Sequence, residues 1–191
     1  MTFRRGFKAE AERIALELRS ELEVGPYDKL DPNALAEYLC VPILTLHDLQ
    51  HAVPDDVHHL LGRGRSAFSA ATIYVSRFKR LIITNPAHAT TRQMNSLCHE
   101  LSHILLDHET ETPLLTGGQR EWNRVQESEA DWLAGCLLIP NDAAHAAARD
   151  GRTDEEVAAV YGVSVVLATW RMRMTGARIR RERRLASRRS R

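Results

Sequence analysis

Hydrophobic side chains in the first part of the chain recur at the spacing of an amphipathic helix. Between residues 7 and 24, six apolar side chains fall on one stripe of a 3.6-residue repeat: Phe7, Ala11, Ile14, Ala15, Leu18 and Leu22. Gly25 and Pro26 follow and are expected to end this helix. A second, short helix is predicted in the segment DPNALAEYL, with Asp31 as its N-cap and Pro32 in its first position.

Short runs of β-branched and aliphatic residues predict a small sheet in the first half of the chain. These runs are VPILTL at residues 41–46, AATIYV at residues 70–75 and LIIT at residues 81–84. Only the polar stretch SRFKR separates the last two, which is typical of a hairpin or of two neighbouring strands. Between the first and second runs, residues 54–62 have the pattern of a short helix that ends at Gly62.

Helical periodicity dominates the second half of the chain. A helix is expected over residues 90–108, capped by Thr90 or Thr91. Another is expected over about residues 119–138, followed by three short helices across residues 141–175. The order of elements predicts an α+β fold, with a small twisted sheet packed on helices and a helical unit at the C-terminal end.

Charge is distributed unevenly along the chain. Residues 177–191 contain eight arginines and one glutamate, or +7, so the net charge of +1 leaves −6 for residues 1–176. We interpret the basic segment as a disordered tail, with nucleic-acid contact as the alternative. No apolar run is long enough to span a membrane, and residues 1–25 lack the apolar core of a signal peptide. Three widely spaced cysteines favour a reducing, cytoplasmic location.

The predicted helix over residues 90–108 contains the sequence HELSH. His99 and His103 are four residues apart, so a helix presents them one turn apart on one face, where they can bind one Zn²⁺. Glu100 follows the first histidine, so it lies beside the metal and can take a proton from a metal-bound water. Interleaved apolar residues place both histidines at the border of a buried face, where unpaired polar groups are costly. This context favours an HExxH metal site over surface histidines.

A catalytic zinc site also needs a third protein ligand and an open position. Leu106 and Glu109 stand where a metzincin would have glycine and histidine, so that class is excluded. The segment ESEADWLAGCLLIP offers acids instead, and Glu127 and Asp131 share one helix face within it. We favour Glu127 as the ligand and Asp131 as the hydrogen-bond acceptor for the outer nitrogen of a ligating histidine. Glu129 is the alternative ligand, and manganese or iron would suit the same donors.

The segments HELSHILLDH and ESEADWLAGCLLIP together resemble the motifs of the ImmA/IrrE family of zinc metallopeptidases. The resemblance in the order of elements extends over roughly residues 7–175. It implies three zinc ligands and one catalytic base, namely His99, His103 and Glu127 with Glu100. It also implies a protein substrate, commonly a helix-turn-helix repressor that controls phage, mobile-element or stress-response genes. Asp131 stands where the family commonly has asparagine, and either side chain can accept a hydrogen bond.

We therefore expect three regions along the chain: a zincin-like metallopeptidase domain over residues 1–140, a helical unit over residues 141–176 and the basic tail over residues 177–191. Residues 155–172 resemble a helix-turn-helix motif. The second helix of that motif is strongly apolar, however, so packing or docking of a partner is favoured over reading of DNA.

Two classes of function remain open at this point. The first is a zinc endopeptidase acting on a protein regulator. The second is a zinc-stabilised regulator that binds a repressor or DNA without cutting. Glu100 favours the enzyme, because a purely structural zinc site needs no base beside its ligand. Tyr74 and His88 are candidates for stabilising the oxyanion that forms during peptide hydrolysis.

Overall fold

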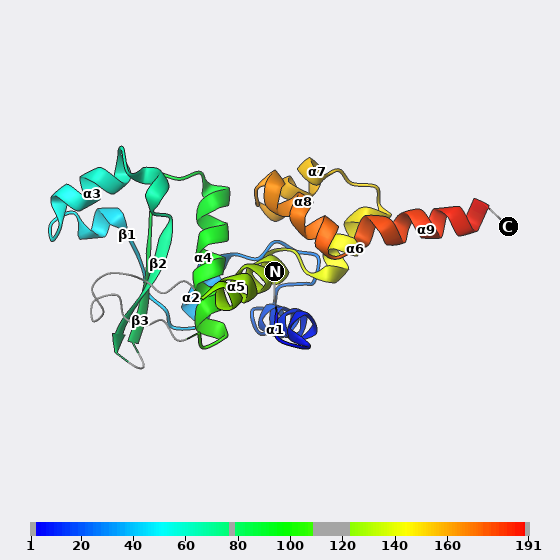
Figure 1. Cartoon of the computed structure of the whole chain (residues 1–191), viewed down its shortest axis with the longest axis horizontal. Coiled ribbons are helices and arrows are strands. Elements are labelled where there is room, and N and C mark those ends of the chain that lie inside the picture. The colour runs from blue at the N-terminus through cyan, green and yellow to red at the C-terminus, as the bar shows by residue number, and fades with distance from the viewer. Residues whose placement is uncertain (1–2, 77–78, 109–122, 190–191) are drawn as a thin grey trace. The chain divides into compact units, whose positions relative to one another are not determined.

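The computed structural model describes residues 3–76, 79–108 and 123–189. The chain divides into two compact units, the first formed by Met1–Phe7 with Asp31–Ala134 and the second by Lys8–Leu30 with Gly135–Arg191. This division differs from the boundary expected at residue 140, because the first long helix belongs with the C-terminal helices. The α+β class is confirmed: the sheet and its helices form the first unit, and the described part of the second unit is helical (Figure 1).

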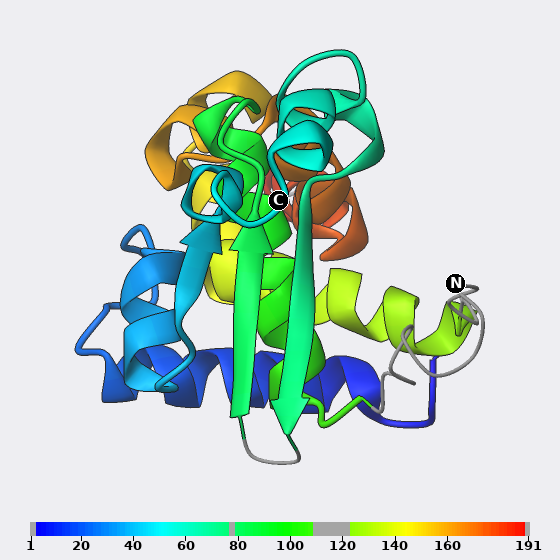
Figure 2. The ribbon, with the colours of Figure 1, turned by 90° about the vertical axis from the view of Figure 1, so that its left-hand side faces the viewer.

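Within the described residues, the first unit contains one three-stranded sheet with the strand order β1-β3-β2. The strands are β1 (Ile43–Thr45), β2 (Ala70–Ser76) and β3 (Lys79–Thr84). β1 runs parallel to β3, and β2 pairs with β3 as an antiparallel hairpin (Figure 2). The first strand is shorter than predicted because a 3-10 turn, η1 (Leu46–Leu49), follows it, and the Asp48 carboxylate accepts hydrogen bonds from the amide and hydroxyl of Thr45.

Two short helices of the first unit begin and end where the sequence predicted. Helix α2 (Pro32–Tyr38) follows Asp31, whose carboxylate accepts a hydrogen bond from the Asn33 amide at 2.9 Å. Helix α3 (Pro54–Leu61) ends at Gly62. A single 3-10 turn, η2 (Arg65–Ala67), then leads towards β2. Both predicted end residues, Asp31 and Gly62, are therefore confirmed.

Helix α4 (Thr90–Leu105) carries the HELSH sequence and packs against β2 and β3. In Figure 2 it lies behind the sheet. The apolar side chains of its inner face are buried, namely Leu97, Cys98 and Leu101. Burial of these three fixes the rotation of the helix about its axis and therefore sets the direction of the residues between them.

The ends of α4 differ from the prediction. Its N-cap is Ala89, without a side-chain hydrogen bond, so the expected capping by Thr90 or Thr91 was wrong. The helix stops at Leu105 rather than at residue 108. Asp107 has a φ of 48°, a left-handed conformation that ends a helix and redirects the chain at His108.

Helix α5 (Arg124–Leu138) is the second helix that builds the site. The side-chain oxygen of Asn123 accepts hydrogen bonds from the amides of Val125 and Gln126, at 3.1 and 3.3 Å, and so caps the helix. The predicted start near Gln119 lies outside the described residues. The helix contributes several fully buried side chains, among them Ala130, Leu133 and Leu137. Its first part lies in the first unit, and its last residues belong to the second.

The helices of the second unit are α1 (Phe7–Glu21, of which Phe7 belongs to the first unit), α6 (Asn141–Arg149), α7 (Asp154–Tyr161), α8 (Val165–Met174) and α9 (Ala177–Arg189). The predicted break at Gly162 is confirmed, because this residue has a φ of 65° and joins α7 to α8. Arg171 is fully buried, where it pairs with Glu12 and donates to the carbonyl of Ile139 at 2.7 Å. Within the described ranges, no helix has the length and apolar character needed to cross a membrane.

The basic segment that was expected to be disordered is instead helical as far as Arg189. Ala177 is 1% exposed, and the guanidinium of Arg178 pairs with Asp154. Helix α9 also packs against α6 and α8. A buried first turn with an ion-pair partner therefore outweighs the repulsion among the arginines, which the sequence alone had suggested would keep this segment unfolded.

Candidate metal centre

The candidate metal centre begins with two histidines on α4. His99 and His103 lie one turn apart, with ring centroids separated by 4.8 Å. Their Nε2 atoms are 3.1 Å apart, so both rings direct the same nitrogen to one point. His103 is only 2% exposed, whereas the His99 side chain keeps 20% of its surface. The pair thus lies at the border of the buried face of the helix.

Helix α5 brings Glu127 to the same point. One carboxylate oxygen lies 3.2 Å from Nε2 of His99, and the other lies 3.7 Å from Nε2 of His103. Two donors that bind one tetrahedral zinc ion at about 2.0–2.1 Å are about 3.3 Å apart. The observed separations bracket this value, so the three side chains fit the donor spacing of a zinc site. These three also form a possible metal-binding group by proximity among the described residues.

The acids of the cluster stabilise the protonated form of His99, and the histidines stabilise the ionised form of Glu127. Burial by itself lowers the pKa of His99, but hydrogen bonds to Asp131 and Glu127 outweigh it and raise that pKa to about 9. Burial would likewise raise the pKa of Glu127, yet the bonds from His103 and His99 hold it well below its usual range. Glu127 is therefore ionised, and a proton and a metal compete for Nε2 of His99.

Asp131 lies beside the outer nitrogen of His99. Its carboxylate oxygen is 2.9 Å from Nδ1 of that ring. A proton on Nδ1 donated to Asp131 leaves the Nε2 lone pair free for a metal, which is the tautomer that a ligand needs. Asp131 is one turn beyond Glu127 on α5, so one helix face supplies both carboxylates that hold His99.

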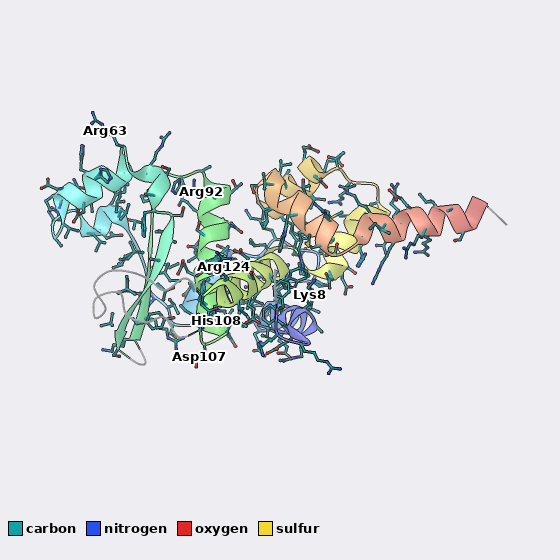
Figure 3. All side chains as sticks on the ribbon, in the orientation of Figure 1. Lys8, Arg63, Arg92, Asp107, His108 and Arg124 are labelled. Carbon is teal, nitrogen blue, oxygen red and sulfur yellow. The ribbon has the colours of Figure 1, made fainter. Side chains whose placement is uncertain are left out.

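The outer nitrogen of His103 has a partner that the sequence analysis missed. Nδ1 of His108 lies 3.0 Å from Nδ1 of His103, and His108 is only 7% exposed. His108 follows the left-handed turn at Asp107, just beyond the C-terminal end of α4 (Figure 3). A helix continued to residue 108 would direct this ring elsewhere, which is why helical spacing did not reveal the contact.

Glu129 supports His108 instead of joining the ligand group. Its carboxylate lies 3.5 Å from Nε2 of His108 and 3.5 Å from the guanidinium of Arg4. Burial and the neighbouring His103 lower the pKa of His108, so this imidazole is neutral. A neutral His108 with its proton on Nε2, towards Glu129, can accept from Nδ1–H of His103 and orient that ring. Glu129, the alternative ligand in the sequence analysis, is thus drawn away from the metal position.

Glu100 is buried, with 6% of its surface exposed, and one carboxylate oxygen is held by β2. The amide and the hydroxyl of Thr72 both donate to this oxygen, at 2.8 and 2.7 Å. Thr72 stands opposite Ile82 in the hairpin, and the Ile82 amide donates to Pro42 on the far side of β3. Thr72 and Ile82 therefore exchange no backbone hydrogen bonds with each other. The amide of Thr72 points away from β3, towards the open edge of the sheet. The expected base accordingly lies at the outer edge of β2.

The two candidates for oxyanion stabilisation have different surroundings. The Tyr74 hydroxyl donates to the carbonyl of His108 at 3.4 Å, which brings it to the end of α4. The guanidinium of Arg80 lies 5.4 Å from the centroid of its ring. His88 lies with Nε2 2.9 Å from the carbonyl of Phe68. Of the two, Tyr74 is the one that contacts the residues around His103, and its oxyanion role stays a prediction.

The fold and the site together define a class of protein. A metallopeptidase domain of this kind needs three parts, and all three are present. They are a helix with the HExxH sequence, an adjacent helix that supplies an acid, and a sheet edge beside the glutamate of the motif. The model of the IrrE N-terminal-like domain family, peptidase family M78, matches residues 62–173. This match covers more than half of the chain, which therefore belongs to that family, and the resemblance found in the sequence is confirmed. No curated protein matches the chain.

Proposed function

We propose that the protein is a zinc-dependent endopeptidase that cuts a protein regulator in the cytoplasm. The observation that carries the proposal is the convergence of His99, His103 and Glu127, with donor separations of 3.1 to 3.7 Å, next to the buried carboxylate of Glu100. A structural zinc site has no use for such a carboxylate beside its ligands. Cys136 is a buried free thiol, which suits a reducing compartment.

The chemistry divides between the ion and the chain. A bound Zn²⁺ supplies a Lewis acid that polarises the peptide carbonyl and lowers the pKa of water towards about 7. Glu100 accepts a proton from the attacking water and later returns it to the leaving amine. Asp131 and His108 hold the ligand rings in the tautomer that leaves each Nε2 free. The hydrogen bonds from Thr72 keep the Glu100 carboxylate in position for the proton transfer.

The outer edge of β2 is the proposed binding line for the substrate backbone. β2 is an edge strand, and an extended peptide can pair with such an edge. Because the backbone amide of Thr72 points away from β3, the backbone amides of Ala70 and Tyr74, two residues to either side, point the same way. A peptide paired there would pass directly beside Glu100, whose carboxylate accepts a hydrogen bond from the outward-pointing amide of Thr72.

A helix-turn-helix repressor is the first candidate substrate. This choice rests on the resemblance to the ImmA/IrrE family, whose members act on such repressors, and not on a contact in the site. Family membership supports the peptidase class. The identity of the substrate is open to a direct test with purified repressors.

The decisive experiment replaces Glu100 by glutamine. The amide oxygen of glutamine can still accept both hydrogen bonds from Thr72, so the fold and the metal site are expected to remain. Loss of a general base typically costs about 10²- to 10⁴-fold in rate. We expect Glu100→Gln to keep one equivalent of zinc, measured by elemental analysis, and to lose repressor cleavage, followed by mass spectrometry.

Glu37→Gln is the matched control, because Glu37 is an exposed glutamate on α2 of the same unit. It is expected to cleave at the wild-type rate. Full cleavage by Glu100→Gln would remove the base assignment. If that variant and the wild type both displace a repressor from DNA without cutting it, the protein is a zinc-stabilised antagonist and not a peptidase.

A further inference from the structure

A second cluster of charged side chains lies in the second unit and shares no residue with the metal centre. A cavity of about 380 Å³ lies between α6 and α9. Five cationic or imidazole side chains line it: His145, Arg149, Arg180, Arg181 and Arg184. The remaining lining residues, Ala177 and Leu185, are aliphatic. We call these seven residues the arginine groove.

The charges of the arginine groove are poorly neutralised by the chain itself. Arg149 has an exposed neighbour in Asp150 at 3.7 Å. Within the described residues, no carboxylate lies within ion-pair distance of Arg180, Arg181 or Arg184, whereas Arg178 on the same helix pairs with Asp154. The resulting like-charge repulsion is relieved when an anion binds.

His145 adds a hydrogen-bonding group to the groove rather than another charge. Its Nε2 lies 3.4 Å from the guanidinium of Arg180. Burial and the neighbouring Arg180 both lower the pKa of His145, so the imidazole is neutral at physiological pH. A neutral ring can accept from Arg180 and so hold that guanidinium towards the cavity.

From this arrangement we propose that the arginine groove binds the phosphate backbone of double-stranded DNA. All the cations of residues 177–191 are arginines, whose planar guanidinium groups bind phosphate oxygens in pairs. Arg180 and Arg184 are one turn apart, about 6 Å along the helix axis, so they can contact neighbouring phosphates of one strand. Arg149 reaches the same cavity from α6 and extends the contact beyond the basic segment itself.

An acidic protein surface fits the groove less well. Stable protein interfaces are centred on buried aromatic or large apolar side chains. The apolar lining of the groove consists of Ala177 and Leu185 alone. Phosphate contacts need no such anchor, because the release of counterions from the nucleic acid supplies the affinity.

The binding is independent of base sequence. Helix α8, the second helix of the helix-turn-helix-like pair, buries Ala168, Arg171 and Met172. Its exposed N-terminal positions are Val165 and Val166, at 43% and 80%. Valine offers no hydrogen bond to a base edge, so α8 is not equipped to read the major groove. Contacts from the arginine groove go to the backbone and position the protein without choosing a sequence.

The test measures binding of the full chain to a labelled 20-base-pair duplex of arbitrary sequence by fluorescence anisotropy at several salt concentrations. Each phosphate contact contributes a slope of about −0.9 to log K against log salt. Three arginine contacts predict a loss of affinity of about 40-fold between 50 and 200 mM salt. The triple variant with Arg180→Gln, Arg181→Gln and Arg184→Gln is expected to bind more weakly and to have a slope smaller by about 2.7.

The control variant changes three other exposed arginines, with Arg5→Gln, Arg173→Gln and Arg183→Gln, and so has the same net charge. We expect it to retain most of the salt slope. An equal loss in both variants would overturn the proposal, because net charge alone would then explain binding. Tighter binding of a polyglutamate peptide than of the duplex would overturn it in favour of an acidic protein. Either result leaves the peptidase proposal unaffected, since no residue of the arginine groove belongs to the metal centre.

Discussion

The metal centre and the arginine groove are both clusters of ionisable side chains, but their charges are arranged in opposite ways. In the metal centre, histidines and acids alternate: Glu127 and Asp131 contact His99, and Glu129 contacts His108. In the groove, cationic side chains from α6 and α9 face one cavity with little carboxylate neutralisation. The first cluster is largely buried, and the arginines of the second are exposed.

This difference indicates what each cluster is built to bind. Buried ionisable groups are stable only when partners of the chain itself satisfy them, so the metal centre is held in one geometry before any ligand arrives. Exposed like charges are tolerated because water screens them, and they are satisfied best by a mobile external anion. The comparison predicts that single changes have large effects in the first cluster and small ones at the partly exposed ion pair between Arg178 and Asp154 in the second unit.

The largest effect is expected for Glu127→Gln. The variant replaces a charged ligand by a neutral amide, so we expect the zinc affinity to fall by more than about 100-fold, beyond the usual effect of an outer partner. Competition between the metal-free protein and a zinc-binding dye measures this. Glu37→Gln is the matched control. An unchanged affinity for Glu127→Gln, together with a large loss for Glu129→Gln, would restore Glu129 as the ligand.

A smaller effect is expected for His108→Phe. Phenylalanine fills the buried position but accepts no hydrogen bond from Nδ1 of His103. Loss of such a partner typically costs about 10- to 100-fold in metal affinity. The visible spectrum of the Co²⁺-substituted protein should shift as well, because the orientation of the His103 ring changes. His51→Phe, at an exposed histidine, serves as the control. If His108→Phe leaves both affinity and spectrum unchanged, His108 does not orient the ligand.

The smallest effect is expected for Asp154→Asn in the second unit. Burial would raise the pKa of Asp154, but hydrogen bonds from Thr169 and Arg178 outweigh it and lower that pKa. The carboxylate therefore stabilises the fold above about pH 4, and this contribution is lost as the pH falls through the lowered value. A partly exposed pair contributes about 1 kcal/mol or less. Urea denaturation at pH 7 should detect the loss in Asp154→Asn, and at pH 2 the variant and wild type should converge. A loss of several kcal/mol would show that the pair is not a surface contact.

Local patterns in the sequence were enough to find most elements and the residues proposed as ligands. The β-branched runs marked the hairpin, and the four-residue spacing of His99 and His103 placed both on one helix face. Glu127 and Asp131 are also four residues apart and share one helix face, whereas Glu129 between them points to another face. Each of these inferences concerns residues within one helix or strand, where the geometry follows from the period of the element.

Contacts across a turn could not be found in this way. The left-handed conformation of Asp107 ends α4 and carries His108 back to His103, and no periodicity describes such a turn. Nor did composition reveal that α9 is helical, because its stability depends on the burial of Ala177 and on the pair between Arg178 and Asp154.

By itself, the sequence determined the class of the fold, the motif helix and the acids available to complete a metal site. The sequence favoured Glu127 over Glu129, and the tertiary structure brought Glu127 to the histidines and Glu129 to His108. Only the tertiary structure showed that arginines from α6 and α9 share one cavity. The physical reason is that spacing along one helix sets direction about its axis, whereas the meeting of two helices depends on how their buried faces pack.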